Sequence, residues 1–307
     1  MSNGPSSLEM QAARDAGQQP AVTIAIPFYN PGNVFELALK SVFAQTYTDW
    51  ELLLLDDGSS DGSAELARRL KDPRVVIHSD GEQHGLSRRL NEAAQLARGA
   101  YLFRMDADDL MHPERVAEQL AVLRASPPNT VVGSSAYSIN GETEIVGYRP
   151  APTTQQAGYA ARYSFLHPTV ASSVAWFRAN PYATEPIFRR CEDAELWCRS
   201  SVHSTFRWVE RPLMFYREVG VFKLGNYIAG VEGLLEINRR IERDRARRLK
   251  VSVSEHVKMA IARTLDALGA ADIMVRKRFR PVDGTEAAIA TRVVETLVET
   301  RLPLIGV

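Results

Sequence analysis

Residues 51–62 read ELLLLDDGSSDG, an apolar run that ends directly in acidic, serine and glycine residues. Leu52–Leu55 shows no polar alternation, which is typical of a strand that helices cover on both faces. The run therefore predicts a buried strand at Glu51–Asp56. Comparable short apolar stretches predict four more strands, at Val22–Ile26, Val75–Ser79, Tyr101–Met105 and Val131–Ala136.

The segments between these strands are amphipathic and long enough for helical crossovers. They are Val34–Ala44, Ser63–Leu70, Leu86–Arg98 and Pro113–Arg124. Because such crossovers make neighbouring strands parallel, the fold class expected is α/β, with a doubly wound, mostly parallel sheet. Residues 137–185, rich in Gly, Pro, Thr and Tyr, predict loops and mixed strands at the edge of this sheet. A further helix is expected at Arg189–Ser201, and helices again from Gly225 to Leu302.

Composition excludes several protein classes. The 307 residues are 45% apolar and 24% charged with 37 basic and 37 acidic side chains, so neither disorder nor charge-driven binding to nucleic acid is expected. The sequence offers no apolar run of roughly 18 residues and no hydrophobic leader, which predicts neither a membrane span nor export. Cys191 and Cys198 would lie about 10 Å apart along a helix, too far for a disulfide, as expected in the cytoplasm.

Polar residues follow three of the predicted strands at the point where each strand ends. These segments are Pro27-Phe28-Tyr29-Asn30, Asp56-Asp57-Gly58-Ser59-Ser60-Asp61-Gly62 and Asp106-Ala107-Asp108-Asp109. The carboxyl ends of parallel strands meet at one edge of the sheet, where ligands of open α/β sheets bind. Crowded carboxylates favour Mg²⁺ or Mn²⁺, and the helix start near Arg88 and Arg89 could hold a diphosphate. The alternative is that each segment is only a turn or a helix cap.

These three segments and the residues before them resemble the signatures of family 2 inverting glycosyltransferases with the GT-A fold. The preceding residues are Ile24-Ala25-Ile26 for the first segment, Leu54-Leu55 for the second and Arg104-Met105 for the third. The resemblance covers about residues 21–217. It implies a GT-A-like domain at 21–220. The Ser-, Gln- and Gly-rich leader predicts a flexible tail at 1–20, and the helical pattern after the domain predicts a helical C-terminal region at 221–307. Within the domain, residues 21–136 would bind the nucleotide and 137–220 the acceptor.

The resemblance also implies a role for individual residues. Pro27 and Tyr29 would line the base pocket, and Asp57 would accept a hydrogen bond from N3–H of uracil or thymine. Asp106 would hold the ribose or the donor sugar, and Asp108 would bind the divalent metal. Further donor-binding residues expected on the same basis are Asn30, Arg88, Ala107 and His167. Asp109 could instead cap the next helix, and His167 could be a structural histidine.

An inverting transfer needs a base that takes the proton of the acceptor hydroxyl. Arg190-Cys191-Glu192-Asp193 resembles the acidic pair that opens a helix downstream of the metal motif, and implies Asp193 as the base with Glu192 as second choice. The alternative is that both acids only complement the helix dipole. Two positions depart from the family pattern: Leu90 stands where Arg is frequent, and Glu218 follows Tyr216-Arg217, close to where many relatives place a metal-binding His.

The function predicted is a metal-dependent inverting glycosyltransferase that uses a UDP- or dTDP-sugar and a glycan or lipid-linked acceptor in surface polysaccharide biosynthesis. A sugar nucleotidyltransferase and a non-catalytic nucleotide-binding scaffold are the alternatives. The basic stretch Arg239–Lys250 could touch the inner face of a membrane, although such a run is usually a solvated helix face. The C-terminal helices could also form a homodimer interface.

Overall fold

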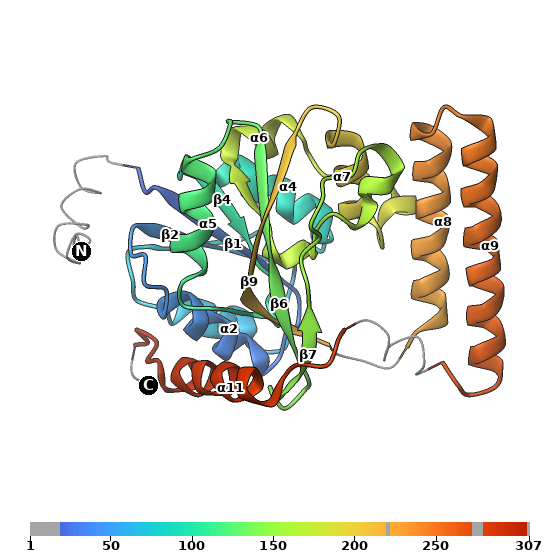
Figure 1. The fold of residues 1–307 in the computed structure, drawn as a ribbon. Coiled ribbons are helices and arrows are strands. Elements are labelled where there is room, and N and C mark those ends of the chain that lie inside the picture. The colour runs from blue at the N-terminus through green and yellow to red at the C-terminus, as the bar shows by residue number, and fades with distance from the viewer. Residues whose placement is uncertain (1–18, 219–221, 272–278, 306–307) are drawn as a thin grey trace.

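The computed structural model describes residues 19–218, 222–271 and 279–305. The predicted tail at 1–20 therefore lies, except for its last two residues, outside the described residues. The described part of the chain forms one nine-stranded sheet in the order β3-β2-β1-β4-β8-β6-β9-β5, with β7 paired to β6. Helices cover both faces of this sheet, and two long helices stand at one side of it (Figure 1).

The first half of the sheet is parallel, as predicted. Its strands are β1 (Val22–Phe28), β2 (Trp50–Asp56), β3 (Val75–Ser79) and β4 (Tyr101–Arg104). The crossover helices are α2 (Val34–Phe43), α3 (Ser63–Arg68), α4 (Leu86–Leu96) and α5 (Arg115–Arg124). Every one of these elements was expected within a few residues of its observed bounds.

Strand β2 shows why this apolar run lacks alternation. Leu52 and Leu54 point into one hydrophobic cluster, which contains residues of α2 and α5. Leu53 and Leu55 point to the opposite face, into a second cluster that contains residues of α4 and of the helices α6 (Val174–Ala179) and α7 (Glu192–Ser200). Successive strand side chains face opposite sides of a sheet, so a strand between two helical layers is apolar at every position.

The second half of the sheet differs from the expectation of mixed strands at its edge. Strand β8 (Ala171–Ser173) inserts antiparallel between β4 and β6 (Thr130–Ile139), in the interior of the sheet. Beyond β6 lie β9 (Thr205–Arg217) and β5 (Leu110–Met111), and β7 (Ile145–Arg149) forms a hairpin with β6. The edge placement was wrong for β8, because a three-residue strand has too short a pattern to show that it lies between two others, whereas β7 pairs with β6 alone.

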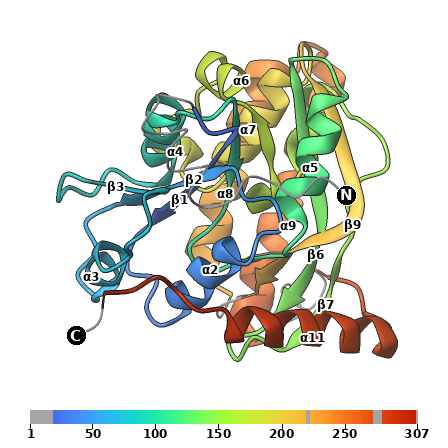
Figure 2. The same ribbon diagram turned by 90° about the vertical axis from the view of Figure 1, so that its left-hand side faces the viewer.

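The C-terminal helices pack in two separate places. Helix α8 (Leu224–Ile241) lies against α7 and α9 (Arg245–Ala267), whereas α11 (Gly284–Glu299) returns across the sheet to pack against α2 and β7 (Figures 1 and 2). The cysteines at the α7 end of this arrangement are free and buried, as predicted. Among the described helices, none combines the length and the apolar character that crossing a bilayer requires.

Close packing joins α8 to the start of α7, and this contact gives a testable expectation. A Cβ built on Gly233 would lie 2.2 Å from Sγ of Cys191 and 2.7 Å from the carbonyl oxygen of Ile187. Gly233→Ala should therefore destabilise the protein by about 1–3 kcal/mol through overpacking, measured by thermal unfolding. Gly225→Ala, on the same helix with no heavy atom within 4 Å of its added Cβ, is the control and should be neutral. Equal stability of the two variants would contradict the tight contact.

Candidate active site

The loops after β1 and β2 are held together by hydrogen bonds between their polar residues. Asn30, with a positive φ of 46°, donates its backbone N–H to Ser59 Oγ and accepts from the Ser60 N–H through its side-chain oxygen. The Gly32 N–H donates to Asp61 at 2.7 Å. Asn30 is thus a positioning residue between two predicted binding loops. Beside it, Tyr29 is half exposed at the end of β1, and Pro27 is buried within that strand.

Hydrogen bonds within the protein hold the carboxylate of Asp57 in place. Its Oδ1 accepts from the backbone N–H groups of His84 and Gly85 and from Nε of Arg89, at 2.7–3.1 Å. Its Oδ2 accepts from the Gly85 N–H, at 3.0 Å. Oδ1 carries three donors and Oδ2 carries one, so Oδ2 keeps a lone pair for a ligand donor.

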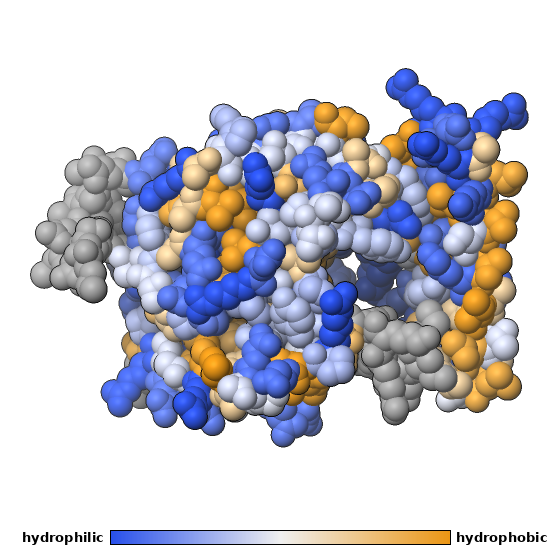
Figure 3. All heavy atoms as spheres, in the orientation of Figure 1, coloured by the Kyte–Doolittle hydropathy of each residue, from blue (hydrophilic) through white to orange (hydrophobic). Residues whose placement is uncertain are grey.

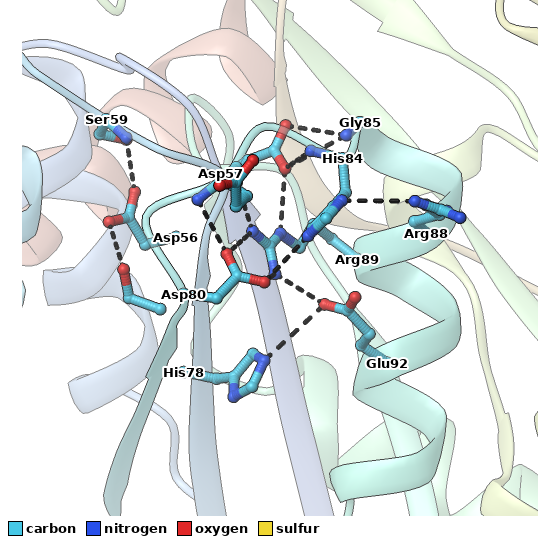
Figure 4. A network of polar contacts seen from close by, with 12 residues as sticks. Asp56, Asp57, Ser59, His78, Asp80, His84, Gly85, Arg88, Arg89 and Glu92 are labelled. Atoms are coloured by element: carbon cyan, nitrogen blue, oxygen red, sulfur yellow. Dashed lines mark hydrogen bonds and ion pairs between the residues drawn. The ribbon is translucent and has the colours of Figure 1, made fainter.

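The guanidinium of Arg89 lies at the centre of this network (Figure 4). The side chain is fully buried and also pairs with Asp80 at 2.7 Å and Glu92 at 2.8 Å. Arg89 lies in the first turn of α4, one position before Leu90, the residue at which the family pattern has Arg. Arg88, the residue that was predicted to bind the donor, is instead exposed and contacts the His84 ring at 3.4 Å.

The acidic loop after β4 is anchored by two buried arginines. Arg104 binds both carboxylate oxygens of Asp106, at 2.5 and 3.0 Å. Arg217, at the end of β9, donates its backbone N–H to Asp109 Oδ1 and its side chain to the carbonyl of Asp108. Asp109 therefore does not cap α5, whose N-cap position is held by Glu114. Ala107 is buried between these acids and fixes the loop by packing.

The donor set of this loop fits a divalent cation. Asp106, Asp108 and Asp109 each offer a carboxylate oxygen, and these atoms lie within 4.8 Å of one another. Asp109 Oδ2 is buried without a hydrogen-bond partner in the described structure. Burial and the charge of Asp106 raise the pKa of Asp108 to about 6. Mg²⁺ or Mn²⁺ would bind these oxygen ligands, give the unpartnered Asp109 oxygen a partner and neutralise the repulsion between the carboxylates.

The start of α7 brings Glu192 and Asp193 into reach of the same loop. Burial raises the pKa of both, and the charge of Asp106 adds to it while Arg104 opposes it. Burial, followed by the charge of the adjacent Asp193, raises the pKa of Glu192 to about 8. Glu192 Oε2 is a buried oxygen without a partner among the described residues. Asp193 Oδ1 accepts from the Ala194 N–H at 2.8 Å. This hydrogen bond favours the ionised form of Asp193 and opposes the rise of its pKa.

His167 lies near enough to Arg104 for the charge of that arginine to act on its ring. Its Nε2 shares a hydrogen bond of 2.9 Å with the hydroxyl of Tyr182, and its ring packs near Trp197. Burial and the charge of Arg104 lower the pKa of His167, so the ring stays neutral. Tyr182 was not singled out from the sequence, and neither were Arg104 and Arg217 in their anchoring roles. The signal available in the sequence was an arginine inside the predicted strand Tyr101–Met105, directly before the acidic residues.

The raised pKa of Glu192 predicts a pH dependence of stability. The folded carboxyl stays protonated up to about pH 8, whereas its ordinary pKa is 4.5, so the free energy of unfolding falls as pH rises between these values. Glu192→Gln removes this loss. Its melting temperature, measured without metal or donor, should match the wild type near about pH 5 and exceed it by several degrees near about pH 8. Glu195→Gln is the control on the same helix, and an equal gain there would refute the assignment.

Comparison with known proteins identifies the family of this chain. The model of the family described as glycosyl transferase family 2 matches residues 23–183, just over half of the chain. A protein of Bacillus subtilis (strain 168) named as the glycosyltransferase EpsE is 26% identical over 78% of this chain and 87% of its own. An Escherichia coli protein, UDP-Glc:alpha-D-GlcNAc-diphosphoundecaprenol beta-1,3-glucosyltransferase WfgD, is 29% identical over 43% of this chain and 51% of its own.

Solved structures share the fold at low sequence identity. The mannosyltransferase PcManGT of Pyrobaculum calidifontis, in complex with GDP-Man and Mn²⁺, has a TM-score of 0.55 and 18% identity, and covers 95% of this chain and 92% of its own. S. aureus TarS 1–349 in complex with UDP has a TM-score of 0.57 and 15% identity, and covers 75% of this chain and 69% of its own. The mixed α/β sheet described above is thus the GT-A fold.

Proposed function

Because this chain belongs to glycosyl transferase family 2, we propose that it transfers a sugar, with inversion, from a UDP- or dTDP-sugar to a hydroxyl of a glycan or lipid-linked acceptor. The observation that carries the proposal is the position of acidic residues after two strands of the parallel half and at the start of one helix. Asp57 lies after β2, Asp106 and Asp108 after β4, and Asp193 at the start of α7 within reach of the charge of Asp106.

The donor nucleotide is bound on the side of β1 and β2. Tyr29 and Pro27 form the edge against which the base lies, with the backbone held by Asn30. Asp57 Oδ2 accepts the imide N–H of uracil or thymine, because Oδ1 already carries three donors. Arg88 is exposed beside the same network and supplies positive charge for the diphosphate. Asp106, which Arg104 orients, lies against the ribose or the donor sugar, and so does Ala107. His167 lies near Arg104.

A divalent cation, Mn²⁺ or Mg²⁺, would be held by Asp108 with help from Asp109 and would neutralise the leaving diphosphate. Asp193 takes the proton of the acceptor hydroxyl. The hydroxyl oxygen of the acceptor forms a bond to the anomeric carbon while the bond from that carbon to the diphosphate breaks. Glu192, protonated at neutral pH, does not compete for this role. Glu218 does not serve as a further ligand, because its carboxylate pairs with Arg149 at 2.5 Å.

We propose that the acceptor belongs to surface polysaccharide biosynthesis, and the relative whose printed name gives a diphosphoundecaprenol-linked acceptor supports the lipid-linked form. The two buried, free cysteines suit a reducing compartment, which supports a cytoplasmic location at the inner face of a membrane. The nucleotidyltransferase alternative finds no support in the family assignment. The scaffold alternative makes the opposite prediction about turnover, because a scaffold would bind the donor without consuming it.

A thermal-shift panel of UDP, dTDP, GDP and CDP, each with and without Mn²⁺, tests the proposed donor. A ligand that binds only the folded state raises its melting temperature. We expect stabilisation by UDP or dTDP that depends on Mn²⁺ and is reduced in Asp57→Asn, since the amide can present a donor where the base needs an acceptor. Stabilisation by GDP alone would contradict the pyrimidine assignment. Metal-stimulated hydrolysis or transfer of the matching nucleotide sugar by the purified chain would exclude the scaffold.

A further inference from the structure

Helix α9 exposes a stripe of large aliphatic side chains along its length, here called the α9 stripe. It consists of Leu249, Val253, Val257 and Ile261 of the helix, with exposed fractions of 65, 55, 51 and 50%, and of the C-cap residue Leu268, which is 73% exposed. Residues four apart lie on one side of a helix, so these side chains form one surface rather than scattered positions. Figure 3 shows apolar residues along the outer edge of the molecule where α9 lies.

The stripe is not the packing face of the helix pair. The buried residues Glu255, Met259 and Ala262 of α9 face α8 and the body instead. Glu255 is paired there with Lys258 at 2.9 Å. In the described part of the chain nothing covers the opposite side of α9. A contiguous exposed apolar surface with a polar border is characteristic of an interaction site.

The charges that border the α9 stripe are mostly positive. Arg245, Arg247 and Lys250 are exposed at one end of the helix and Arg263 near the other. Asp266 is exposed within α9 and Asp244 at its N-cap, whereas Glu255 is buried. Two copies of α9 packed on each other would therefore bring the four cations of one copy against those of the other, with two aspartates on each copy to offset them. An anionic surface would neutralise these cations and take up the stripe at the same time.

The helix pair is also joined closely to the candidate active site. Gly233 of α8 lies so near Cys191 that a Cβ would meet its Sγ at 2.2 Å. Cys191 directly precedes Glu192 and Asp193, the acidic pair at the start of α7. Whatever binds the α9 stripe is therefore held at a fixed position relative to the acceptor side of the site.

We propose that the α9 stripe docks the protein onto an anionic lipid bilayer, with its aliphatic side chains inserted at the headgroup boundary and its bordering cations on the lipid phosphates. The docked protein receives its acceptor from the same membrane, and this second statement rests on the proposed transfer to a lipid-linked acceptor. Membrane docking itself does not depend on that function.

Vesicle co-sedimentation tests the proposal on the full chain. Wild-type protein should bind vesicles of phosphatidylcholine mixed with phosphatidylglycerol and not vesicles of phosphatidylcholine alone. The triple variant Leu249→Gln, Val253→Gln, Val257→Gln keeps good helix formers and should lose roughly tenfold or more of this binding. Arg247→Glu with Lys250→Glu should lose it as well.

A matched control removes three equally exposed aliphatic residues elsewhere. Val202, Ile289 and Val298 are 75, 58 and 50% exposed, and their triple replacement by Gln should leave vesicle binding unchanged. Failure of the wild type to bind, or equal loss in the control, would overturn the proposal. So would a wild-type dimer that the stripe variant converts to a monomer without any vesicle binding, because the stripe would then join two copies.

The stabilisation of each variant by UDP and Mn²⁺ separates this proposal from the proposed function. The stripe lies outside the donor loops, so all variants should keep the wild-type thermal shift with nucleotide. Vesicle binding in a protein that no nucleotide stabilises would leave the docking surface standing and contradict the glycosyltransferase site. A wild-type thermal shift with nucleotide but no vesicle binding would contradict the docking surface and leave the glycosyltransferase site standing.

Discussion

Asp108→Asn should reduce metal-dependent donor turnover by roughly 10²–10³-fold, the usual cost of removing one group that stabilises charge in a transition state. The substitution keeps the shape of the side chain and removes the charge that would hold Mn²⁺ against the leaving diphosphate. The measurement is release of the nucleoside diphosphate as Mn²⁺ is titrated. The wild-type rate should rise with metal, and the variant rate should stay near the metal-free wild-type level.

Unfolding does not account for this expected loss. Burial and the neighbouring Asp106 raise the pKa of Asp108 to about 6, so above that pH its ionised form weakens the metal-free protein. Asp108→Asn should therefore melt at or above the wild-type temperature near neutral pH without metal. Asp266→Asn, at an exposed position on α9, is the control for both measurements. Full turnover in Asp108→Asn would remove this residue from the proposed metal site.

Asp193→Asn should lower kcat by roughly 10²–10⁴-fold while donor binding stays close to that of the wild type. The amide cannot take the acceptor proton, whereas the nucleotide contacts assigned to Asp57 and the loop after β1 are untouched. Steady-state kinetics with varied donor and acceptor, together with the UDP thermal shift, separate these two effects. The pH profile should lose its acidic limb, because that limb reports ionisation of the base.

The neighbouring acids supply the controls for Asp193. Glu195 pairs with Arg199 at 2.7 Å on the same helix, and Glu195→Gln should leave kcat within a few-fold of the wild type. Glu192→Gln should lower kcat less than Asp193→Asn, since Glu192 is protonated at neutral pH. The reverse order, with Glu192→Gln inactive and Asp193→Asn active, would assign the base to Glu192.

The parallel half of the fold could be read from the sequence because its signals are local. Leu52–Leu55 is apolar at every position since α2, α5, α4 and α7 cover both faces of β2. The helix and strand lengths then fix right-handed crossovers and bring the ends of β1, β2 and β4 to one edge. Strand β9 gave no such signal. Its register against β6 shifts between Val209 and Met214, so its apolar residues do not alternate regularly.

The candidate site divides in the same way. Local patterns predicted that Asp57, Asp106 and Asp108 follow the ends of strands, and the family resemblance implied their roles and singled out Asp193. The residues that orient them could not be predicted in this way. Arg88 and Arg89 are adjacent in the sequence, and only the ion pairs of Arg89 with Asp57, Asp80 and Glu92 show that Arg89 is the buried one.

The sequence by itself determined the α/β class, the order of the first four strands and crossover helices, and the acidic groups at their ends. Tertiary structure alone decided that β8 lies inside the sheet, that Arg104 and Arg217 hold the acidic loop, and that α9 leaves an apolar stripe exposed. The physical reason is the range of the interactions. Hydrophobic periodicity and turn chemistry act over a few residues, whereas burial of a guanidinium or the pairing of a three-residue strand depends on partners many tens of residues away.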